Sequence, residues 1–242
     1  MKKTLLIAAA ALAASVISSQ AQVYSQNIVG YVNSTLASGY NTVANPLDNP
    51  TGNSLTNLFP GIVDGTYDGS YIYVWGGTTY TAYYVDSTQG GLNDFGDNGN
   101  VPSPNINPGS AIFISANAAH TNTFVGAVHV DAAATGGQVV GQTTNTFSGL
   151  AFLSSKLPIG GGINAVLGLP TGSGNLDGSY LYVPIITGGG LHGFTGYYID
   201  STLGGNGIAD FGDNNLVTEP VIPVGGGLFI QHTGPFSWVQ GL

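Results

Sequence analysis

The residues best suited to chemistry in this chain are aspartates and asparagines that recur with similar spacing in two loops. Carboxylate and amide oxygens on a glycine-containing loop are ligands that calcium prefers. The spacing matches no EF-hand loop, and Asp and Asn also favour turns because their side chains bond their own backbone. Calcium binding and turn formation are therefore both interpretations of these loops. The candidate calcium ligands are Asp86, Asp94, Asp97, Asn98, Asp200, Asp210, Asp213 and Asn214.

A second candidate site is a line of aromatic side chains in two predicted strands. Side chains alternate between the faces of a strand, so Tyr71, Tyr73 and Trp75 share one face. Tyr180 and Tyr182 repeat this pattern later in the chain. An exposed line of rings would stack on sugars, whereas buried rings would form cross-strand pairs in a core. Core packing is the favoured interpretation, and sugar binding is the alternative.

Few residues are arranged for catalysis. The chain has no Cys, which excludes a thiol nucleophile, and its four His are not at metal-ligand spacing. Asp86 and Asp97 are the two carboxylates that could act as a glycosidase pair. We therefore predict a protein that is not an enzyme and needs no cofactor, calcium excepted. A glycan-degrading enzyme is a distant alternative.

A duplication of the chain positions these candidates. Asp68-Gly-Ser-Tyr71 recurs as Asp177-Gly-Ser-Tyr180, and Asp94-Phe-Gly-Asp97 recurs as Asp210-Phe-Gly-Asp213, in the same order. A run of identities in fixed order indicates an internal repeat. The predicted segments are a signal peptide at 1–21, a first β repeat at 22–130, a linker at 131–137 and a second β repeat at 138–242.

Local signals within each repeat favour β-strands. Aromatic and β-branched residues over 71–85, interrupted by two glycines, predict a hairpin. In the second repeat its loop is predicted to be longer, from Pro184 to Gly193. Short helical pieces are expected at 54–59, capped by Asn53, and at 163–168. The predicted fold class is all-β, a tandem duplication of a small sandwich-like or barrel-like unit with very little helix.

The first residues have the pattern of an export signal. Lys2 and Lys3 precede an apolar stretch over 5–14, and Ala21 ends a cleavage site of small residues. We predict a secreted protein, extracellular or at the cell surface, with the periplasm as the alternative and no membrane insertion. Once the two leading lysines are removed, Lys156 is the one cation against twelve carboxylates. Nucleic acid is therefore excluded as a partner, because phosphate binding requires clustered basic residues.

The low charge of the surface suggests how the protein acts. Charged residues make up 6% of the chain, so Asn, Thr, Ser and Gly are expected to cover it. Such a surface has little charge to keep copies apart or to guard strand edges. The leading hypothesis is a structural or matrix role through non-covalent contacts, by self-association or with other surface proteins. A carbohydrate-binding module that contacts polysaccharide through its Tyr/Trp face is the alternative.

Several segments resemble those of a group of bacterial proteins. They are Ile28-Val-Gly-Tyr-Val-Asn33, Ile112-Phe-Ile114 and Thr123-Phe-Val-Gly126. These are similar to the β unit of uncharacterised exported two-repeat proteins of the verrucomicrobial type, and to the GWNLIS-type β unit of surface proteins. Ser110 and Gly226 stand where that group has the glutamate of its PGEGFF segment. The resemblance implies a secreted β domain and brings no catalytic residues.

Overall fold

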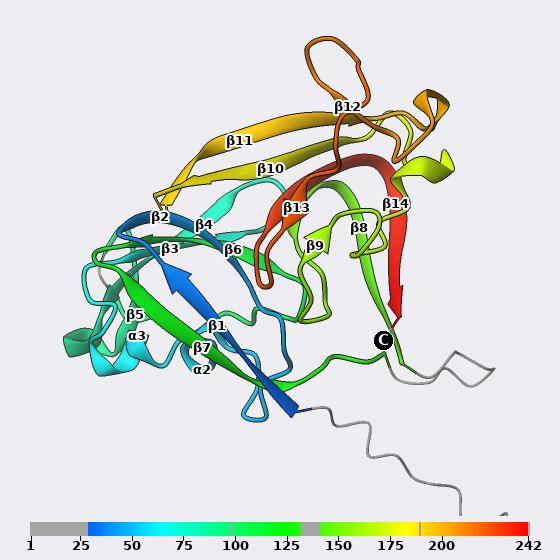
Figure 1. Ribbon diagram of the computed structural model, residues 1–242. Helices are drawn as coiled ribbons and strands as arrows, with labels where there is room; N and C mark the ends of the chain where they lie inside the picture. Colours follow the sequence, from blue (N-terminus) through cyan, green and yellow to red (C-terminus); the bar gives the residue numbers. More distant parts are fainter. Residues whose placement is uncertain (1–28, 98, 132–140, 189, 242) are drawn as a thin grey trace, which may run out of the picture.

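The computed structural model describes residues 29–97, 99–131, 141–188 and 190–241. The predicted signal peptide, most of the predicted linker and Asn98 lie outside these residues. Antiparallel strands dominate the described chain, so the predicted all-β class is confirmed (Figure 1). None of the helices that the structure describes has the length and apolar character needed to span a bilayer.

The first half, over 29–131, combines a five-stranded sheet with a two-stranded ribbon. The sheet has the order β2-β6-β3-β4-β5. Its strands are β2 (Gly39–Ala44), β3 (Tyr71–Trp75), β4 (Tyr80–Asp86), β5 (Gly91–Asp94) and β6 (Ala111–Ala116). The ribbon pairs β1 (Val29–Leu36) with β7 (His120–Ala127). The short helical elements are α2 (Leu55–Leu58), α3 (Gly61–Asp64) and the 3₁₀ turn η1 (Ser87–Gln89).

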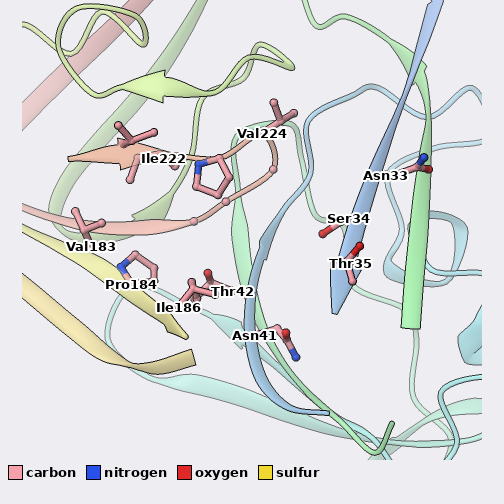
Figure 2. A pocket seen from close by; sticks show the side chains of 15 residues that line it. Asn33, Ser34, Thr35, Asn41, Thr42, Val183, Pro184, Ile186, Ile222 and Val224 are labelled. Atoms are coloured by element: carbon pink, nitrogen blue, oxygen red, sulfur yellow. The ribbon is translucent and has the colours of Figure 1, made fainter. Parts of the chain in front are cut away.

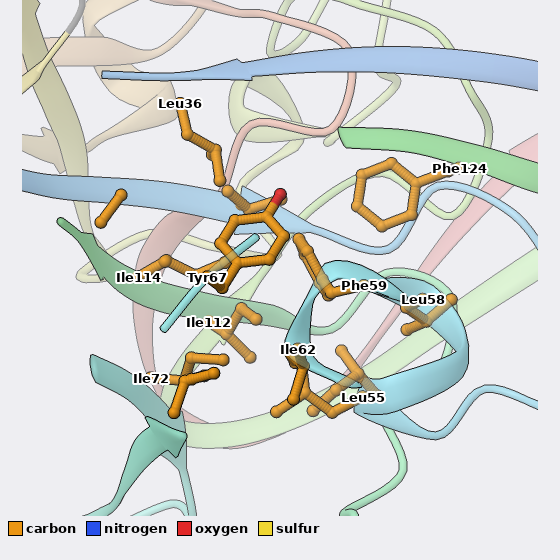
Figure 3. Close-up of a cluster of buried hydrophobic side chains, with 14 of the residues drawn as sticks. Leu36, Leu55, Leu58, Phe59, Ile62, Tyr67, Ile72, Ile112, Ile114 and Phe124 are labelled. Carbon is orange, nitrogen blue, oxygen red and sulfur yellow. The ribbon is translucent and has the colours of Figure 1, made fainter. Parts of the chain in front are cut away.

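The core of the first half collects side chains from the sheet, the ribbon and the helices (Figure 3). Ile72 and Ile114 are neighbours across β3 and β6, and both are buried in it. Phe59 meets Phe124 of β7 edge to face, with ring centroids 5.3 Å apart. Because side chains alternate along β3, its aromatic residues lie on the opposite face of the sheet from this core.

The second half, over 141–241, has a sheet of the order β12-β11-β10-β14-β8. Its strands are β8 (Gln142–Leu153), β10 (Tyr180–Thr187), β11 (Gly190–Ile199), β12 (Ile208–Asp210) and β14 (Leu228–Gly241). A small pair joins β9 (Gly161–Gly162) to β13 (Val221–Ile222), and two 3₁₀ turns are η2 (Thr171–Ser173) and η3 (Ser201–Leu203). Trp238 is fully buried in this core, where its indole N–H donates to the Leu167 carbonyl at 2.9 Å.

Residues at matching positions of the two repeated sequence segments have cross-strand partners of the same type in the two sheets. Tyr71 lies opposite Tyr84 across β3 and β4, and Tyr180 lies opposite Tyr198 across β10 and β11. In the first half β6 pairs with β2 and β7 pairs with β1. In the second half the long strand β14 pairs with the long strand β8 along nearly its whole length, so β8 corresponds to β1 and β2 together. These pairings support the predicted duplication, which stays a prediction.

The Asp-Gly-Ser-Tyr segments also have matching local structure. Asp68 accepts from the backbone N–H and the hydroxyl of Ser87 at 2.7 and 2.8 Å, and Asp177 accepts from Ser201 at the same two distances. The glycine after each aspartate has a φ of 80° or 81°, a left-handed conformation that favours glycine. The segment therefore stabilises the entry to a strand.

The longer loop predicted over Pro184 to Gly193 is wrong. β10 continues to Thr187 and β11 begins at Gly190, because the β-branched residues after Pro184 favour an extended strand. Pro184 is tolerated since β14 pairs with β10 only over 180–182, so one edge of β10 needs no N–H donor beyond that point. The extended hairpin reaches across to β2 of the first sheet (Figure 1).

Two short-range predictions also need correction. Ser54, not Asn53, caps α2, and its hydroxyl accepts the N–H of Asn57 at 3.4 Å. Asn53 instead bonds within the loop that precedes the helix. Residues 163–168 form turns and not a helix, and Gly168, with a left-handed φ of 71°, ends the segment after little more than one turn.

Candidate functional site

The acidic residues of the two repeated loops bond to the backbone of their own turns. Asp94 accepts the N–H of Gly96 at 2.6 Å, and Asp210 accepts the N–H two residues on at 2.7 Å. Asp97 accepts the N–H of Gly99 at 2.9 Å. All these bonds span two residues, which is the geometry of a turn stabilised by an aspartate side chain.

The remaining acidic candidates have the same kind of partner. Asp86 and Asp200 cap η1 and η3, and each accepts a threonine N–H at 2.9 Å. Hydrogen bonds lower the pKa of Asp86, and the largest contribution comes from the side chain of Thr88. Hydrogen bonds from Asn215 likewise lower the pKa of Asp213, and the largest contribution comes from the backbone N–H of Asn215.

Turn formation accounts for the bonds that these carboxylates make. Asn214 has a φ of 55°, in the left-handed region that asparagine tolerates in turns. Within the described ranges, no three His, Cys, Asp or Glu side chains gather so that they could hold a metal ion. Calcium binding stays a prediction, and Asn98 lies outside the described residues.

The predicted line of aromatic side chains is divided between two environments. Tyr71 and Tyr180 form matching three-ring groups with a second tyrosine and an exposed phenylalanine. In the first group, the rings of Tyr84 and Phe95 lie 5.3 and 5.5 Å from Tyr71. The second group places Tyr198 and Phe211 at 5.5 and 5.2 Å from Tyr180.

Trp75, Tyr73 and Tyr182 instead face the junction between the two halves. The Trp75 indole N–H donates to the Leu150 carbonyl of the second half at 3.1 Å. The same ring meets Phe229 edge to face at 5.9 Å. We call this junction the seam cluster; it comprises Ala44, Ala111, Phe152 and Phe229, with Trp75, Phe113, Leu150, Tyr182 and Phe194 packed against them.

A stack of three phenylalanines forms the centre of the seam cluster. Phe113 of the first half stacks on Phe152 with centroids 4.6 Å apart, and Phe152 stacks on Phe229 at 4.3 Å. The two sheets thus meet through the faces that do not cover the two main cores. Ile112-Phe113-Ile114 and Leu228-Phe229-Ile230 are similar in sequence, but the meeting of the two phenylalanines depends on how the halves dock.

Two open grooves adjoin the seam cluster and together form what we call the aromatic cleft. Their volumes are about 290 and 370 Å³, and they share Tyr80 and Phe194. One is lined by Tyr40, Tyr73, Tyr80, Phe113, Leu191 and Phe194, and the other by Trp75, Tyr80, Leu150, Tyr182, Phe194, Phe229 and Gln231. Rings from both halves therefore face one cleft.

Two tyrosines of the aromatic cleft, Tyr73 and Tyr80, have a raised pKa. Burial raises the pKa of Tyr80 to about 12. Burial, and then a hydrogen bond with Tyr40, raises the pKa of Tyr73 to about 12. The cleft thus combines apolar ring faces with phenolic hydroxyls and the amide of Gln231, without a charged side chain among the residues that line it.

A further pocket of about 240 Å³ lies between β1 and β2 on one side and β10 and the β13 loop on the other (Figure 2). Ser34, Thr35 and Thr42 face Pro184 and Val224 across it (Figure 2). None of the residues that line it is charged, so it holds no general acid, general base or ionic ligand.

One serine–histidine contact resembles part of a hydrolase site. The Ser179 hydroxyl and His232 Nδ1 are 2.8 Å apart. Ser179 is 1% exposed, however, so a substrate has no access to its hydroxyl. Ser70 is the matching residue of the first half, and it bonds Asn117 instead of a histidine. This contact is therefore structural.

Comparison with known proteins identifies no relative: no protein-family model, no curated protein and no solved structure matches the chain.

Proposed function

We propose that this chain is an exported, non-enzymatic β protein that binds a glycan chain in the aromatic cleft between its two halves. The observation that carries the proposal is the convergence of rings from both halves on two adjoining open grooves that share Tyr80 and Phe194. Ligand sites are concave, mostly apolar and aromatic, with a few polar groups that fix orientation. The cleft has this composition.

Sugars suit this combination of groups. The C–H faces of a pyranose ring stack on aromatic faces, while hydroxyls bond phenols and amides at the edges. The cleft volumes, about 290 and 370 Å³, are near the range of about 300–1,000 Å³ that small ligands occupy. The rings are also held in place before binding, because Trp75 is anchored to the Leu150 carbonyl. A preformed site loses less conformational entropy on binding.

Calorimetry of the mature protein with cellohexaose, xylohexaose, chitohexaose and mannohexaose tests the proposal. We expect saturable binding of at least one of these, weakened about tenfold by Tyr80→Ala, which removes a ring shared by both grooves. Tyr31→Ala is the matched control, since Tyr31 is 74% exposed and lies outside the cleft. The proposal fails if none of these sugars binds at millimolar concentration, or if the two variants bind alike.

Self-association is a second candidate function, supported by the edge strand β1. Among the described residues β1 pairs with β7 alone, so its other edge carries no ladder partner. Its cross-strand pair Tyr31 and Val125 is apolar and exposed. Unguarded strand edges associate with other chains. Tyr31→Lys should then convert a self-associating mature protein to monomer in sedimentation velocity. A wild-type protein that sediments as a clean monomer at high concentration would contradict this second function.

A further inference from the structure

A polar cavity of about 530 Å³ lies where the loops of the first half meet β8 of the second. It shares no lining residue with the aromatic cleft. Its lining holds the one lysine of the described chain together with a carboxylate, an imidazole, hydroxyls and amides. The residues are Asp48, Asn107, Pro108, Ser110, His129, Thr144, Asn145, Thr146 and Lys156.

Among the residues that the structure describes, Lys156 has no carboxylate partner. All twelve carboxylate side chains lie in the described residues, and the two ion pairs found there both involve His129. The side chain is only partly exposed and lines the cavity. A partly buried ammonium group favours a nearby anion, because such a pair replaces part of its lost hydration.

The one carboxylate that lines the cavity, that of Asp48, is already paired with a histidine. His129 Nδ1 lies 2.5 Å from the Asp48 carboxylate, and His129 Nε2 lies 3.5 Å from that of Asp131. The imidazole therefore lies between two carboxylates. Lys156 is the one lysine or arginine among the residues that line the cavity, and no carboxylate lies within 4 Å of it in the described chain.

Hydrogen bonds between the halves and within the second half fix the cavity wall. The N–H of Ser154 donates to the Gly109 carbonyl at 2.8 Å, and the Asn145 amide donates to the Ser154 carbonyl at 3.1 Å. Ser110 forms an isolated β-bridge with Leu153. Ser110, Thr144 and Thr146, which line the cavity, therefore lie on or beside anchored backbone.

We propose that this cavity binds a uronate sugar, with its carboxylate paired to Lys156 and its ring hydroxyls bonded by the serine, threonine and asparagine side chains. A hydroxyl-rich wall suits a polyol, and one ammonium group suits one carboxylate. The acidic charge elsewhere on the protein is screened beyond about 8 Å at physiological ionic strength. The site goes beyond the glycan cleft proposed above, because it uses different residues and selects charge.

The test compares trigalacturonate with its methyl ester, which differs in lacking the carboxylate charge. Titration of the mature protein, followed by calorimetry, should give binding of the acid at least about tenfold tighter than binding of the ester. Lys156→Gln should remove this preference, while Lys156→Arg should retain it. Thr146→Val should weaken both ligands, since it removes a hydroxyl and no charge.

Two controls separate this site from the cleft and from misfolding. Tyr80→Ala should leave trigalacturonate binding unchanged, and Lys156→Gln should leave neutral hexasaccharide binding unchanged. The melting temperature and circular dichroism of Lys156→Gln should match the wild type, because Lys156 forms no ion pair with any residue in the described ranges. Equal affinity for acid and ester, unchanged binding in Lys156→Gln, or no binding of trigalacturonate at millimolar concentration overturns the proposal.

Discussion

The three stacked phenylalanines of the seam cluster allow a quantitative test of how the halves are joined. Phe152 is almost fully buried, whereas Phe113 is half-buried. Truncation of a buried phenylalanine to alanine costs about 3–5 kcal/mol of unfolding free energy. We expect Phe152→Ala to cost about 4 kcal/mol. Phe113→Ala should cost about 2 kcal/mol, because part of its ring already contacts water.

These two substitutions should not be additive. The rings of Phe113 and Phe152 stack 4.6 Å apart, and such a pair contributes about 0.5–1.5 kcal/mol beyond its buried area. The double variant should therefore lose about 1 kcal/mol less than the sum of the single variants. Phe95→Ala is a matched control away from the seam, where an exposed ring should cost less than about 1 kcal/mol.

Urea unfolding followed by tryptophan fluorescence provides the measurement. Trp75 lies in the seam cluster and Trp238 in the core of the second half, so Trp75→Phe leaves only the second core to report. Halves joined by the stack should unfold with one midpoint in both proteins. Additive effects of Phe113→Ala and Phe152→Ala on the free energy of unfolding, or two separate midpoints, would show that the stack does not couple the halves.

Three further predictions concern pH, calcium and the two Asp-Gly-Ser-Tyr segments. Burial raises the pKa of Tyr67 to about 12 from a usual value near 10, so the stability that its neutral form contributes is present below pH 10 and is lost as the pH rises to about 12. In urea titrations between these pH values, Tyr67→Phe should therefore lose less stability with rising pH than the wild type. An unchanged loss would contradict this prediction. Because the acidic loops form turns, millimolar calcium should move the melting temperature by less than about 1 °C. A larger rise that disappears in the double variant Asp97→Asn/Asp213→Asn would establish metal sites instead. Asp68→Ala and Asp177→Ala should each lower the free energy of unfolding by about 1–3 kcal/mol and by similar amounts, since each removes matching hydrogen bonds to a serine. Strongly unequal losses in chemical denaturation would argue against equivalent roles of the two aspartates.

The parts of the fold that depend on neighbouring residues could be predicted from the sequence. The hairpin over 71–85 follows from aromatic and β-branched residues around a glycine turn, and it forms as β3 and β4. Local signals do not distinguish two adjacent residues that cap helices equally well. Asn53 and Ser54 are both good helix caps, and which of them caps depends on the loop bonds that Asn53 makes.

The aromatic cleft could be predicted only in part. Alternation placed the rings of β3 on one face, but their burial depends on docking between segments far apart in the chain. The carbonyl that anchors Trp75 belongs to Leu150, 75 residues later. The extension of β10 past Pro184 likewise depends on where β14 stops pairing. Neither the divided aromatic line nor the cavity around Lys156 has a local signal in the sequence.

The most direct test of the proposed glycan site is the emission of Trp75 during titration with the neutral hexasaccharides. Trp75 lines the cleft, whereas Trp238 is fully buried, so a bound sugar should change the emission of Trp75 alone. We expect a saturable change that is lost in Trp75→Phe, weakened in Tyr80→Ala and retained in Tyr31→Ala. A calorimetrically detected sugar that leaves the emission of the wild type unchanged would contradict binding in the aromatic cleft.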